Sequence, residues 1–524
     1  MHSTHQPGMR LLAENTVYKR QPSRDLFAMD GVESNSVPTT GTLSAAPPWQ
    51  LSLPHVCVAL MSAILFGYHL GVVNIPLQYI ARDLEFADSS IAQGFVVSIC
   101  LIGAFGGCAM SGMVADWLGR RRAFQISTLP MILGTALSAV APVLAVMLIG
   151  RLLVGIGLGI GGPVLSLYIS EVLYFSELDL LLCSLLVVMG LSSSDFSRQL
   201  QISPTEIRGM YGSLSQIATC CGILGSLLVG LPISTVPGWW RACFWIATVP
   251  AALLLLGMEF CAESPRWLFK KSRWYEAEHE LERLWGLSYA KTGMVHLLQN
   301  EESEDENTTS SWEDLFDKRY IRVVMIGSAL FALQQLSGIN AIFYFSATVF
   351  RKAGVSSDVA ASVCVGVINL LGSCIAAYLM DRKGRRSLLI WSFSGMAFAM
   401  AMQAAVGSLH AASSLQGSIS LLATSLYVFM FAIGAGPVPA LLLPEIFPNA
   451  IRAKAMSVAM CVHWVGNVLI GLTYLDLLHH LGAATLYSFF TAVCLLAALF
   501  VKKHVLETKG RSLEDIEAFL LGGL

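Results

Sequence analysis

Apolar runs long enough to cross a lipid bilayer follow one another along most of the chain. A spanning helix needs ~20 consecutive apolar residues. Only 13% of the 524 residues are charged, where soluble domains carry about 25%. The chain is therefore predicted to be an all-α polytopic membrane protein, which excludes a soluble enzyme, a secreted disulfide scaffold and a disordered chain. The runs lie near 54–74, 91–115, 123–141, 143–170, 210–232 and 240–260, and then near 321–350, 356–380, 387–408, 417–443, 453–475 and 482–501.

Charge and cysteine content argue against nucleic-acid binding and against a metal site. The chain carries 33 Lys plus Arg against 35 Asp plus Glu, a formal net charge of −2, which argues against a nucleic-acid partner. The cysteines stand singly in apolar runs apart from the pair Cys220 and Cys221, and no CxxC or Cys/His cluster has the spacing of metal ligands. We therefore expect no metal, no cofactor and no nucleic-acid binding.

An internal repeat divides the chain into two matching halves. The sequence Asp-Trp-Leu-Gly-Arg-Arg at 116–121 follows the second apolar run, and Asp-Arg-Lys-Gly-Arg-Arg at 381–386 follows the eighth. Duplicated motifs at matched positions indicate two pseudo-symmetric halves of six helices each. We place these halves at 54–261 and 321–504, with a helical cytoplasmic linker at 262–320 and cytoplasmic tails at 1–53 and 505–524.

A thirteenth apolar run lies within residues 173–202 and does not fit this plan. Glu171 and Pro204, after the fourth run, match Glu445 and Pro448, after the tenth, only if residues 173–202 are an insertion. The charges agree, because twelve spans with both ends in the cytoplasm leave all but five of the 33 Lys and Arg inside. The insertion is either a retained intron or gene-model error, or a tolerated loop or interfacial helix.

Charged side chains repeat at the predicted cytoplasmic ends of the helices in both halves. Opposite charges at neighbouring helix ends can pair when that side is closed and separate when it opens, which gives two moving halves a bistable gate. Simple anchoring by positive-inside charge is the alternative for the arginines. The candidate gate charges are Asp116, Arg120, Arg121, Glu171, Arg208, Asp381, Arg385, Arg386, Glu445 and Arg452.

Ordered motifs along the chain resemble those of one known family. They are GMVADWLGRR at 112–121, SPTEIRG at 203–209, AESPRWL at 262–268, QQLSGIN at 334–340, DRKGRR at 381–386, PEIFP at 444–448 and LETKGR at 506–511. Together they resemble the sugar porter family of the major facilitator superfamily, and most closely its plant plastidic-glucose-transporter-like members. The resemblance implies a major facilitator fold of twelve transmembrane helices and a transporter rather than an enzyme. It also implies that Arg151, inside the fourth run, belongs to the cytoplasmic gate charges, and a role in packing that helix is the alternative.

Uncharged amides in the apolar runs are candidates for binding a neutral sugar. A hexose offers hydroxyl donors and acceptors, so its site needs amides and aromatic faces rather than fixed charge. Gln334, Gln335 and Asn340 share one run and face a common space only if the helix breaks near Gly338. A buried amide also serves as a link between helices. By resemblance, the sugar-coordinating positions are Gln216, Gln334, Gln335, Asn340, Asn369, Trp464 and Asn467.

Departures from the family pattern leave the preferred sugar open. Ala432 and Ala440 stand where many sugar porters have Glu and Trp, and Phe345 stands where Tyr is common. We expect transport of a hexose by alternating access, with glucose as the substrate that the resemblance implies. A non-transporting sugar sensor, or a form inactivated by the insertion, are the alternatives.

His69 bears on how transport is driven. It ends the sequence Phe-Gly-Tyr-His at 66–69, where proton-coupled sugar porters resemble FGYD and many uniporters have a neutral residue. No Asp or Glu stands in the middle of a predicted span. We expect facilitative uniport with a neutral His69, and proton symport through His69 is the alternative.

The resemblance implies the plastid envelope as the location. Residues 1–50 carry no apolar h-region of a secretory signal, and Glu14, Asp25, Asp30 and Glu33 make them more acidic than a plastid transit peptide usually is. The Golgi, vacuolar and plasma membranes are therefore the alternative locations. The expected partners are a small sugar and the lipid bilayer, and a monomer is sufficient.

Overall fold

The computed structural model describes residues 50–172, 207–233, 236, 238–305, 312–352, 355, 357–408, 414–448 and 451–509. These ranges consist of helices and short connections, without a strand. The predicted insertion at 173–202 and most of the two predicted tails lie outside the described residues.

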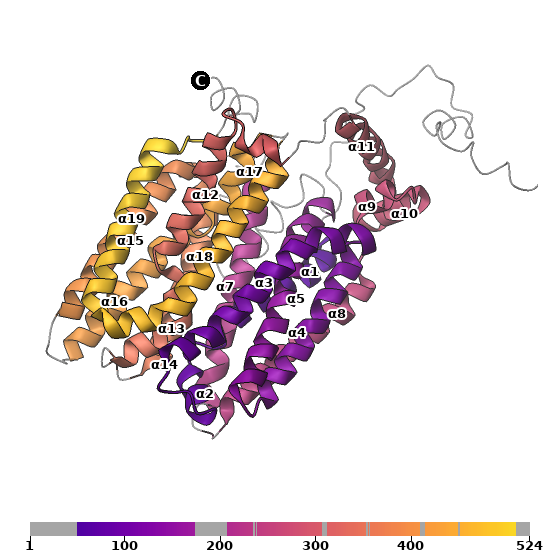
Figure 1. Cartoon of the computed structure of the whole chain (residues 1–524). Helices are drawn as coiled ribbons and strands as arrows, with labels where there is room; N and C mark the ends of the chain where they lie inside the picture. Colours follow the sequence, from indigo (N-terminus) through magenta and orange to yellow (C-terminus); the bar gives the residue numbers. More distant parts are fainter. Residues whose placement is uncertain are drawn as a thin grey trace, which may run out of the picture. The chain divides into compact units, whose positions relative to one another are not determined.

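The helices follow the two predicted halves and the linker between them. The first half, indigo to magenta in Figure 1, contains α1 (Leu53–Gly71), α2 (Leu77–Asp83), α3 (Ser90–Leu118), α4 (Arg120–Val140), α5 (Leu144–Val172), α7 (Ile207–Ile233) and α8 (Trp239–Phe260). The segment predicted as a linker contains α9 (Pro265–Lys270), α10 (Trp274–Trp285), α11 (Leu287–Asp305) and the 3₁₀ turn η1 (Glu313–Phe316). The second half contains α12 (Ile321–Leu336), α13 (Ile339–Lys352), α14 (Asp358–Lys383), α15 (Arg385–Ser408), α16 (Ser414–Met430), the π-helical η2 (Phe431–Ala435), α17 (Val438–Ile446), α18 (Arg452–His480) and α19 (Gly482–His504).

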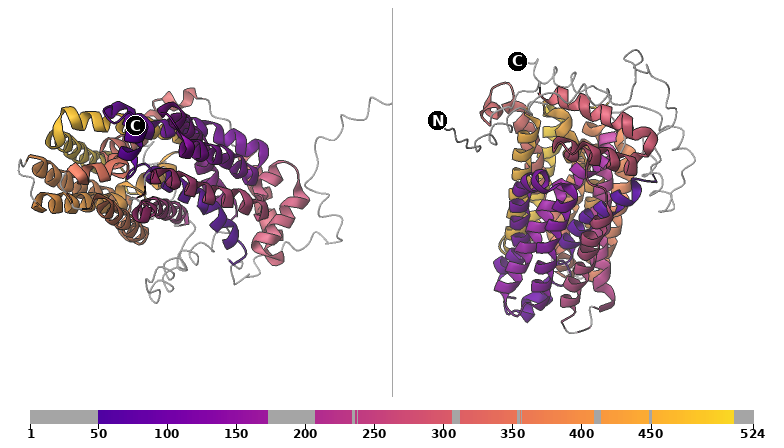
Figure 2. Two further views of the ribbon diagram at one scale, coloured as in Figure 1. Left: turned by 90° about the horizontal axis from the view of Figure 1, so that it is seen from below. Right: turned by 90° about the vertical axis from the view of Figure 1, so that its right-hand side faces the viewer.

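Eleven helical segments in the described part are long and apolar enough to cross a membrane. The described apolar part of α7, Leu214–Gly230, is shorter and supplies the fifth span of the first half. Span seven consists of α12 and α13, and span ten consists of α16, η2 and α17. The long helices lie alongside one another in Figure 2. The predicted all-α fold of twelve spans in two sets of six is confirmed.

Glycine lets the spans of the first half approach closely. A Cβ on Gly155 of α5 would lie 2.0 Å from the carbonyl oxygen of Cys100, and one on Gly159 would lie 2.1 Å from that of Ala104. The backbones of α5 and α3 therefore meet directly, which is how membrane helices with small residues pack.

Two spans of the second half are broken near their middle. Gly338 separates α12 from α13 and has φ +89°, a left-handed conformation that glycine adopts without steric cost. The predicted break near Gly338 is thus confirmed. In span ten, the π-helical η2 and Pro437 interrupt the regular helix before α17 begins, and such a bulge releases backbone carbonyl groups for other partners.

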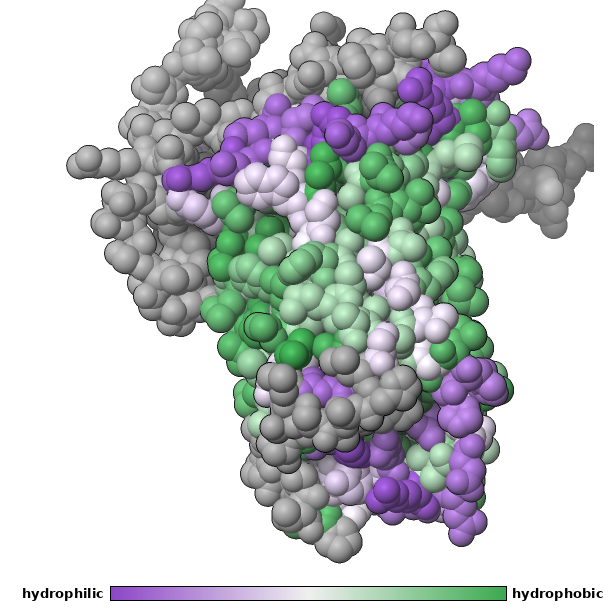
Figure 3. Space-filling view, turned by 90° about the vertical axis from the view of Figure 1, so that its left-hand side faces the viewer, coloured by the Kyte–Doolittle hydropathy of each residue, from purple (hydrophilic) through white to green (hydrophobic). Residues whose placement is uncertain are grey.

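The surface is that of a membrane protein. Figure 3 shows a hydrophobic belt between hydrophilic ends, and large apolar side chains such as Leu256, Phe398 and Leu499 stay exposed. The end that carries the two repeated turns, at Gly119 and Gly384, is called the motif end below. The end that carries α2 and the C-terminus of α13 is called the opposite end.

Candidate functional site

Three polar side chains from spans seven and eleven form one hydrogen-bonded network beside the break at Gly338. Asn340 donates its Nδ2 to Oε1 of Gln335, and Nε2 of Gln335 lies 2.9 Å from Nδ1 of His463 in α18. In this orientation the Gln335 amide donates, so Nδ1 of His463 accepts and the imidazole carries its proton on Nε2. Gln335 and Asn340 are both buried. The network therefore consists of uncharged donors and acceptors in a fixed order.

Gln334 joins this network to the break in span ten. Its Nε2 donates to the carbonyl oxygens of Ala435 at 2.5 Å and Gly436 at 3.3 Å, and its Oε1 accepts from Nε2 of Gln335. The carbonyl groups that the irregular backbone of span ten leaves open are thus bound by an amide of span seven. Gln334 therefore links span seven to span ten, whereas its neighbour Gln335 binds Asn340 and His463.

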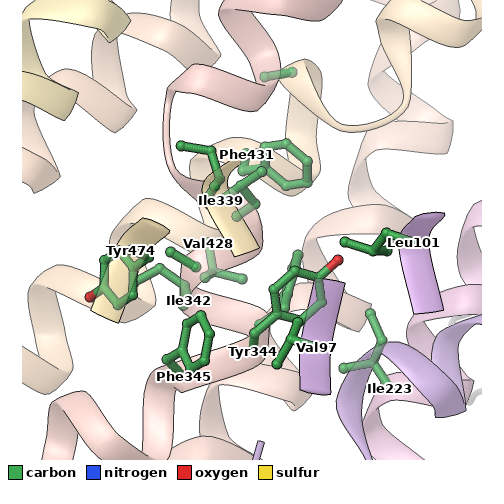
Figure 4. Close-up of a cluster of buried hydrophobic side chains, with 14 of the residues drawn as sticks. Val97, Leu101, Ile223, Ile339, Ile342, Tyr344, Phe345, Val428, Phe431 and Tyr474 are labelled. Carbon is green, nitrogen blue, oxygen red and sulfur yellow. The ribbon is translucent and has the colours of Figure 1, made fainter. Parts of the chain in front are cut away.

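Aromatic residues border the network on the side of α18. Tyr344 of α13 donates its hydroxyl to Oδ1 of Asn467 at 2.9 Å. Trp464 meets Phe66 of α1 edge to face, with ring centroids 6.2 Å apart, so it contacts the first half. Figure 4 shows Tyr344 within a buried cluster that also includes Val97 of α3. The cluster thus unites residues of both halves around α13.

The remaining two predicted sugar positions meet at a thiol. Asn369 of α14 donates its Nδ2 to Sγ of Cys220 at 3.2 Å, and Gln216 of α7 donates to the same sulfur at 3.6 Å. Ser373 of α14 lies 3.2 Å from this sulfur. Cys220 thereby links spans five and eight across the two halves.

The structure brings the predicted sugar residues together in three groups. Gln334, Gln335 and Asn340 form the amide network, Trp464 and Asn467 follow His463 on α18, and Gln216 and Asn369 meet at Cys220. Three partners were not predicted: His463, Tyr344 and Cys220. His463 lies four residues before Asn467, and Tyr344 lies four residues after Asn340, so helical spacing from predicted positions is the signal that could have found both.

Charged residues at the motif end pair within each half. Arg120 binds Glu171 through two hydrogen bonds of 2.7 and 2.9 Å and lies 3.3 Å from Asp116. In the second half, Arg385 lies 3.3 Å from Glu445. The repeat in the sequence is therefore a repeat of ion pairs, and Glu171 keeps its pair although the predicted insertion begins two residues later.

Two further carboxylates that the sequence prediction missed hold the repeated turns. Glu263 accepts the N–H groups of Arg120 at 2.9 Å and Arg121 at 3.2 Å, both on Oε1. Glu507 accepts the corresponding N–H groups, from Arg385 at 2.9 Å on Oε1 and from Arg386 at 3.1 Å on Oε2. Each carboxylate sits at the N-terminus of a helix, where the backbone amides and the helix dipole favour negative charge.

The turns themselves require glycine. Gly119 and Gly384 have φ values of +91° and +83°. A Cβ at Gly119 would lie 2.4 Å from the Glu263 carboxylate, and one at Gly384 would lie 2.5 Å from the Glu507 carboxylate. Burial raises the pKa of Glu263, and the hydrogen bonds from Ser264, Arg121 and Arg120 oppose that shift.

The other predicted gate charges differ in their surroundings. Arg121 forms an ion pair with Glu259 at 2.6 Å, and Arg386 donates to the carbonyl oxygen of Lys502. Arg452 donates its Nε to the carbonyl oxygen of Phe447 at 3.1 Å. The side chains of Arg208 and Asp381 lie outside the described part of the chain.

Arg151 does not lie at the motif end. It precedes Glu171 on α5 by twenty positions, which is about 30 Å along a helix. Its guanidinium donates to the carbonyl oxygens of Val96 at 3.3 Å and His69 at 3.2 Å, and it is buried. The prediction that Arg151 belongs to the cytoplasmic gate charges is therefore wrong, because its contacts join α5 to α1 and α3 near the opposite end.

His69 lies in α1, two residues before the helix ends, and is 1% exposed. Within the described residues, neither of its ring nitrogens has a hydrogen-bond partner. Its carbonyl group holds Arg151, so a permanent positive charge is fixed next to it.

Twelve spans, two repeated halves, broken spans seven and ten, and a buried network of uncharged amides define a multi-pass transporter of the major facilitator fold. The family model described as "Sugar (and other) transporter" matches residues 55–173 and 199–520. The chain belongs to this sugar transporter family. The stretch between the two matched segments falls within the predicted insertion.

Similar proteins agree with this assignment along nearly the whole chain. "Probable plastidic glucose transporter 2" of Arabidopsis thaliana is 51% identical, over 97% of this chain and 98% of that protein. "Probable plastidic glucose transporter 3" of the same plant is 50% identical, over 96% of each. The solved structure of the proton:xylose symporter XylE of E. coli, bound to 6-bromo-6-deoxy-D-glucose, covers 90% of this chain and 99% of its own, with 27% identity and a TM-score of 0.70.

Proposed function

We propose that this protein transports a hexose, glucose in the first place, across a membrane by alternating access and without coupling to protons. The observation that carries the proposal is the Asn340–Gln335–His463 network at the break of span seven. It offers donors and acceptors but no formal charge, which suits the hydroxyl groups of a neutral sugar. The names of the Arabidopsis relatives support glucose as the substrate.

In this proposal, the sugar binds between the two halves. Gln335 and Asn340 coordinate it from span seven, Asn467 and Trp464 from span eleven, Gln216 from span five and Asn369 from span eight. Gln334 acts mainly through span ten, because its amide already binds Ala435 and Gly436. The ion pairs Arg120–Glu171 and Arg385–Glu445 serve as the gate charges of the motif end.

Arg151 favours uniport over proton coupling. A proton added to the His69 ring would place a second positive charge in the buried region where Arg151 is held by the His69 carbonyl group. Two like charges in a site of low dielectric repel strongly. A neutral His69 is the arrangement that this geometry supports.

Proton symport through His69 is the second candidate. The similarity to XylE, a proton:xylose symporter, favours it, as do the unpartnered ring nitrogens of His69 among the described residues. The two candidates differ in whether an imposed pH gradient concentrates sugar.

The plastid envelope is the membrane that the relatives' names support. A fluorescent fusion of the complete chain, viewed together with an envelope marker, tests it. Signal at the Golgi, vacuolar or plasma membrane would contradict this location.

Counterflow in proteoliposomes tests the transport proposal. The purified full chain should exchange radiolabelled D-glucose for internal unlabelled D-glucose, and L-glucose should not compete. The Asn340→Ala variant should raise the half-saturation constant about fivefold or more, because a lost hydrogen bond within a buried network costs about 1 kcal/mol. Sugar binding at equilibrium without counterflow would instead identify a sensor.

A further inference from the structure

One side chain of the first half, Asn74, is bound to helix α13 of the second half. Asn74 lies in the turn between α1 and α2 at the opposite end and is 2% exposed. Its Nδ2 donates to the carbonyl oxygen of Phe343 at 2.7 Å and to Oγ of Ser346 at 2.8 Å. Its Oδ1 accepts the N–H of Ala347 at 3.0 Å. Both amide hydrogens and the amide oxygen are therefore used across the boundary between the halves.

The two backbone groups that Asn74 binds are partners in an ordinary α-helix. The N–H of residue i bonds to the carbonyl group of residue i−4, and Ala347 follows Phe343 by four positions. A carboxamide carries the same donor and acceptor as a peptide group. The Asn74 side chain thus offers α13, from outside the helix, the same donor and acceptor that pair in one rung of its hydrogen-bond ladder.

Helix α13 also carries part of the sugar site. Asn340 and Tyr344, one turn apart, bind Gln335 and Asn467 respectively. Phe343 lies between them in sequence, so Asn74 holds the same turn of the helix that presents both groups. The position of α13 consequently depends on whether the opposite end is closed.

Among the described polar contacts between α13 and the first half, those of Asn74 are buried. Gln78, one helical turn further along the first half, binds Arg351 of α13, but this contact is exposed and Arg351 also pairs with Asp358. Exposed pairs of this kind contribute little. The hydroxyl of Ser346 donates in turn to Oγ of Ser362 in α14 at 3.1 Å. This bond anchors the Asn74 contact within the second half.

We propose that Asn74 is an exchangeable rung of α13 and positions this helix for the transport step. With the opposite end closed, the Asn74 amide binds Phe343 and Ala347. When that end opens, Asn74 leaves with the first half, and the carbonyl group of Phe343 and the N–H of Ala347 bind each other. Neither state leaves a buried backbone group of α13 without a partner, which would be costly. The inference rests on the alternating access of the proposed function.

Transport kinetics measured separately from the two faces test this role. Proteoliposomes of known orientation give a half-saturation constant for D-glucose at each end. The Asn74→Ala variant loses the contacts of the state closed at the opposite end. The constant at the opposite end should fall relative to that at the motif end, and their ratio should change about tenfold, as expected for the loss of several buried hydrogen bonds.

Three further variants separate the exchangeable rung from general packing. Asn74→Asp keeps the volume and the acceptor for Ala347 but sets an oxygen against the carbonyl oxygen of Phe343, so it should shift the ratio at least as far as Asn74→Ala. Ser346→Ala removes the bonds to Asn74 and Ser362 but leaves the rung intact, and Gln78→Ala removes the exposed contact. These two controls should change the ratio by about twofold or less. An unchanged ratio in Asn74→Ala, or wild-type behaviour of Asn74→Asp, would overturn the proposal.

Hydrogen exchange of the full chain in nanodiscs supplies a readout that needs no transport. In Asn74→Ala, amides at 72–84 should exchange faster, whereas those at 343–350 should stay protected because the α13 rung closes on itself. Equal loss of protection in both segments would show a simple anchor and overturn the exchangeable rung. If the wild-type protein moves no hexose while the exchange pattern is as expected, the proposed sugar transport fails and the role of Asn74 stands.

Discussion

Arg151 donates a hydrogen bond to the backbone carbonyl group of His69 at 3.2 Å. A guanidinium group is thereby fixed against the residue that the sequence offers as a proton carrier. Arg151 also binds the carbonyl oxygen of Val96, so it ties three helices together near the opposite end. This arrangement gives Arg151 a place in the fold and makes a charged His69 unfavourable.

Replacing His69 should therefore leave the driving force of transport unchanged. In proteoliposomes with an imposed pH gradient, the wild-type protein and the His69→Asn variant should both bring glucose to equal concentrations inside and outside. Asn is uncharged at every pH, so it reproduces the neutral ring. Accumulation above equilibrium in the wild-type protein that disappears in His69→Asn would establish proton symport instead.

The hydrogen bond from Tyr344 to Asn467 should matter for sugar affinity. Tyr344→Phe removes the donor of a buried 2.9 Å bond and leaves Oδ1 of Asn467 without it. A loss of about 1 kcal/mol corresponds to a half-saturation constant about fivefold higher. Counterflow kinetics measure this constant.

Tyr474 provides the matched control for Tyr344. Its hydroxyl lies 3.1 Å from that of Tyr487, in the same buried cluster (Figure 4), and this contact involves no side chain of the amide network. Tyr474→Phe should lower thermal stability and leave the half-saturation constant within twofold of the wild type, on the scale of a single hydrogen bond. Similar constants in Tyr344→Phe and the wild type would remove Asn467 from the sugar site.

The sequence predicted the fold well because its strongest signals are local. Twelve apolar runs, the repeated turns at Gly119 and Gly384 and the break at Gly338 each depend on residues close together in the chain. Arg151 was misplaced by the family resemblance, although it lies only eight residues into the fourth run, which starts on the external side when both chain ends are in the cytoplasm. Its partners, backbone carbonyl groups of two other helices, leave no mark in a sequence. Likewise, Glu263 and Glu507 are far from the repeated turns in the sequence. They bind these turns only because later spans bring the chain back to the same end of the protein.

The two capping carboxylates should respond differently to the same substitution. In Glu263, one oxygen accepts the N–H groups of Arg120, Arg121 and Ser264, so the remaining oxygen of a glutamine can replace it. In Glu507, the two oxygens divide the N–H groups of Arg385 and Arg386 between them. Glu507→Gln turns an NH₂ group toward one of these donors and should cost about 1–2 kcal/mol.

Thermal unfolding in detergent, followed by tryptophan fluorescence, compares these variants. Glu507→Gln should unfold at a lower temperature than Glu263→Gln, and Glu263→Ala should fall below Glu263→Gln because it loses all three acceptor contacts. Equal midpoints for the two glutamine variants would show that the division of the N–H groups has no energetic consequence.

The buried carboxyl group of Glu263 should also make stability depend on pH. Burial raises the pKa of Glu263 in the folded state above the ordinary value of 4.5. At pH values between 4.5 and this raised pKa, the folded state therefore binds more protons than the unfolded state. The free energy of unfolding contributed by this group therefore falls as the pH rises through that window. Glu263→Gln has no such dependence.

The difference between the two proteins isolates this effect from all other titrating groups. The midpoint of Glu263→Gln minus that of the wild type should be more positive at pH 7 than at pH 4.5. A difference that stays constant over this range would show that the Glu263 carboxyl group has the same proton affinity in the folded and unfolded chains.

Removal of residues 173–202 should leave a working transporter. The match to the sugar transporter family stops at residue 173 and resumes at 199, and the repeat predicts that Val172 joins directly to Ser203. The first half is already anchored up to this point, because Glu171 pairs with Arg120 and the carbonyl group of Val172 accepts Nε1 of Trp285 at 2.9 Å. The shortened chain should therefore keep these contacts and exchange glucose at least as fast per molecule as the full chain.

Counterflow by equal amounts of the shortened and full-length purified proteins measures this rate, and sequencing of mature transcripts shows which form is made. If the shortened chain folds but exchanges no sugar while the full chain does, residues 173–202 are part of the working protein and the predicted boundary of the insertion is wrong.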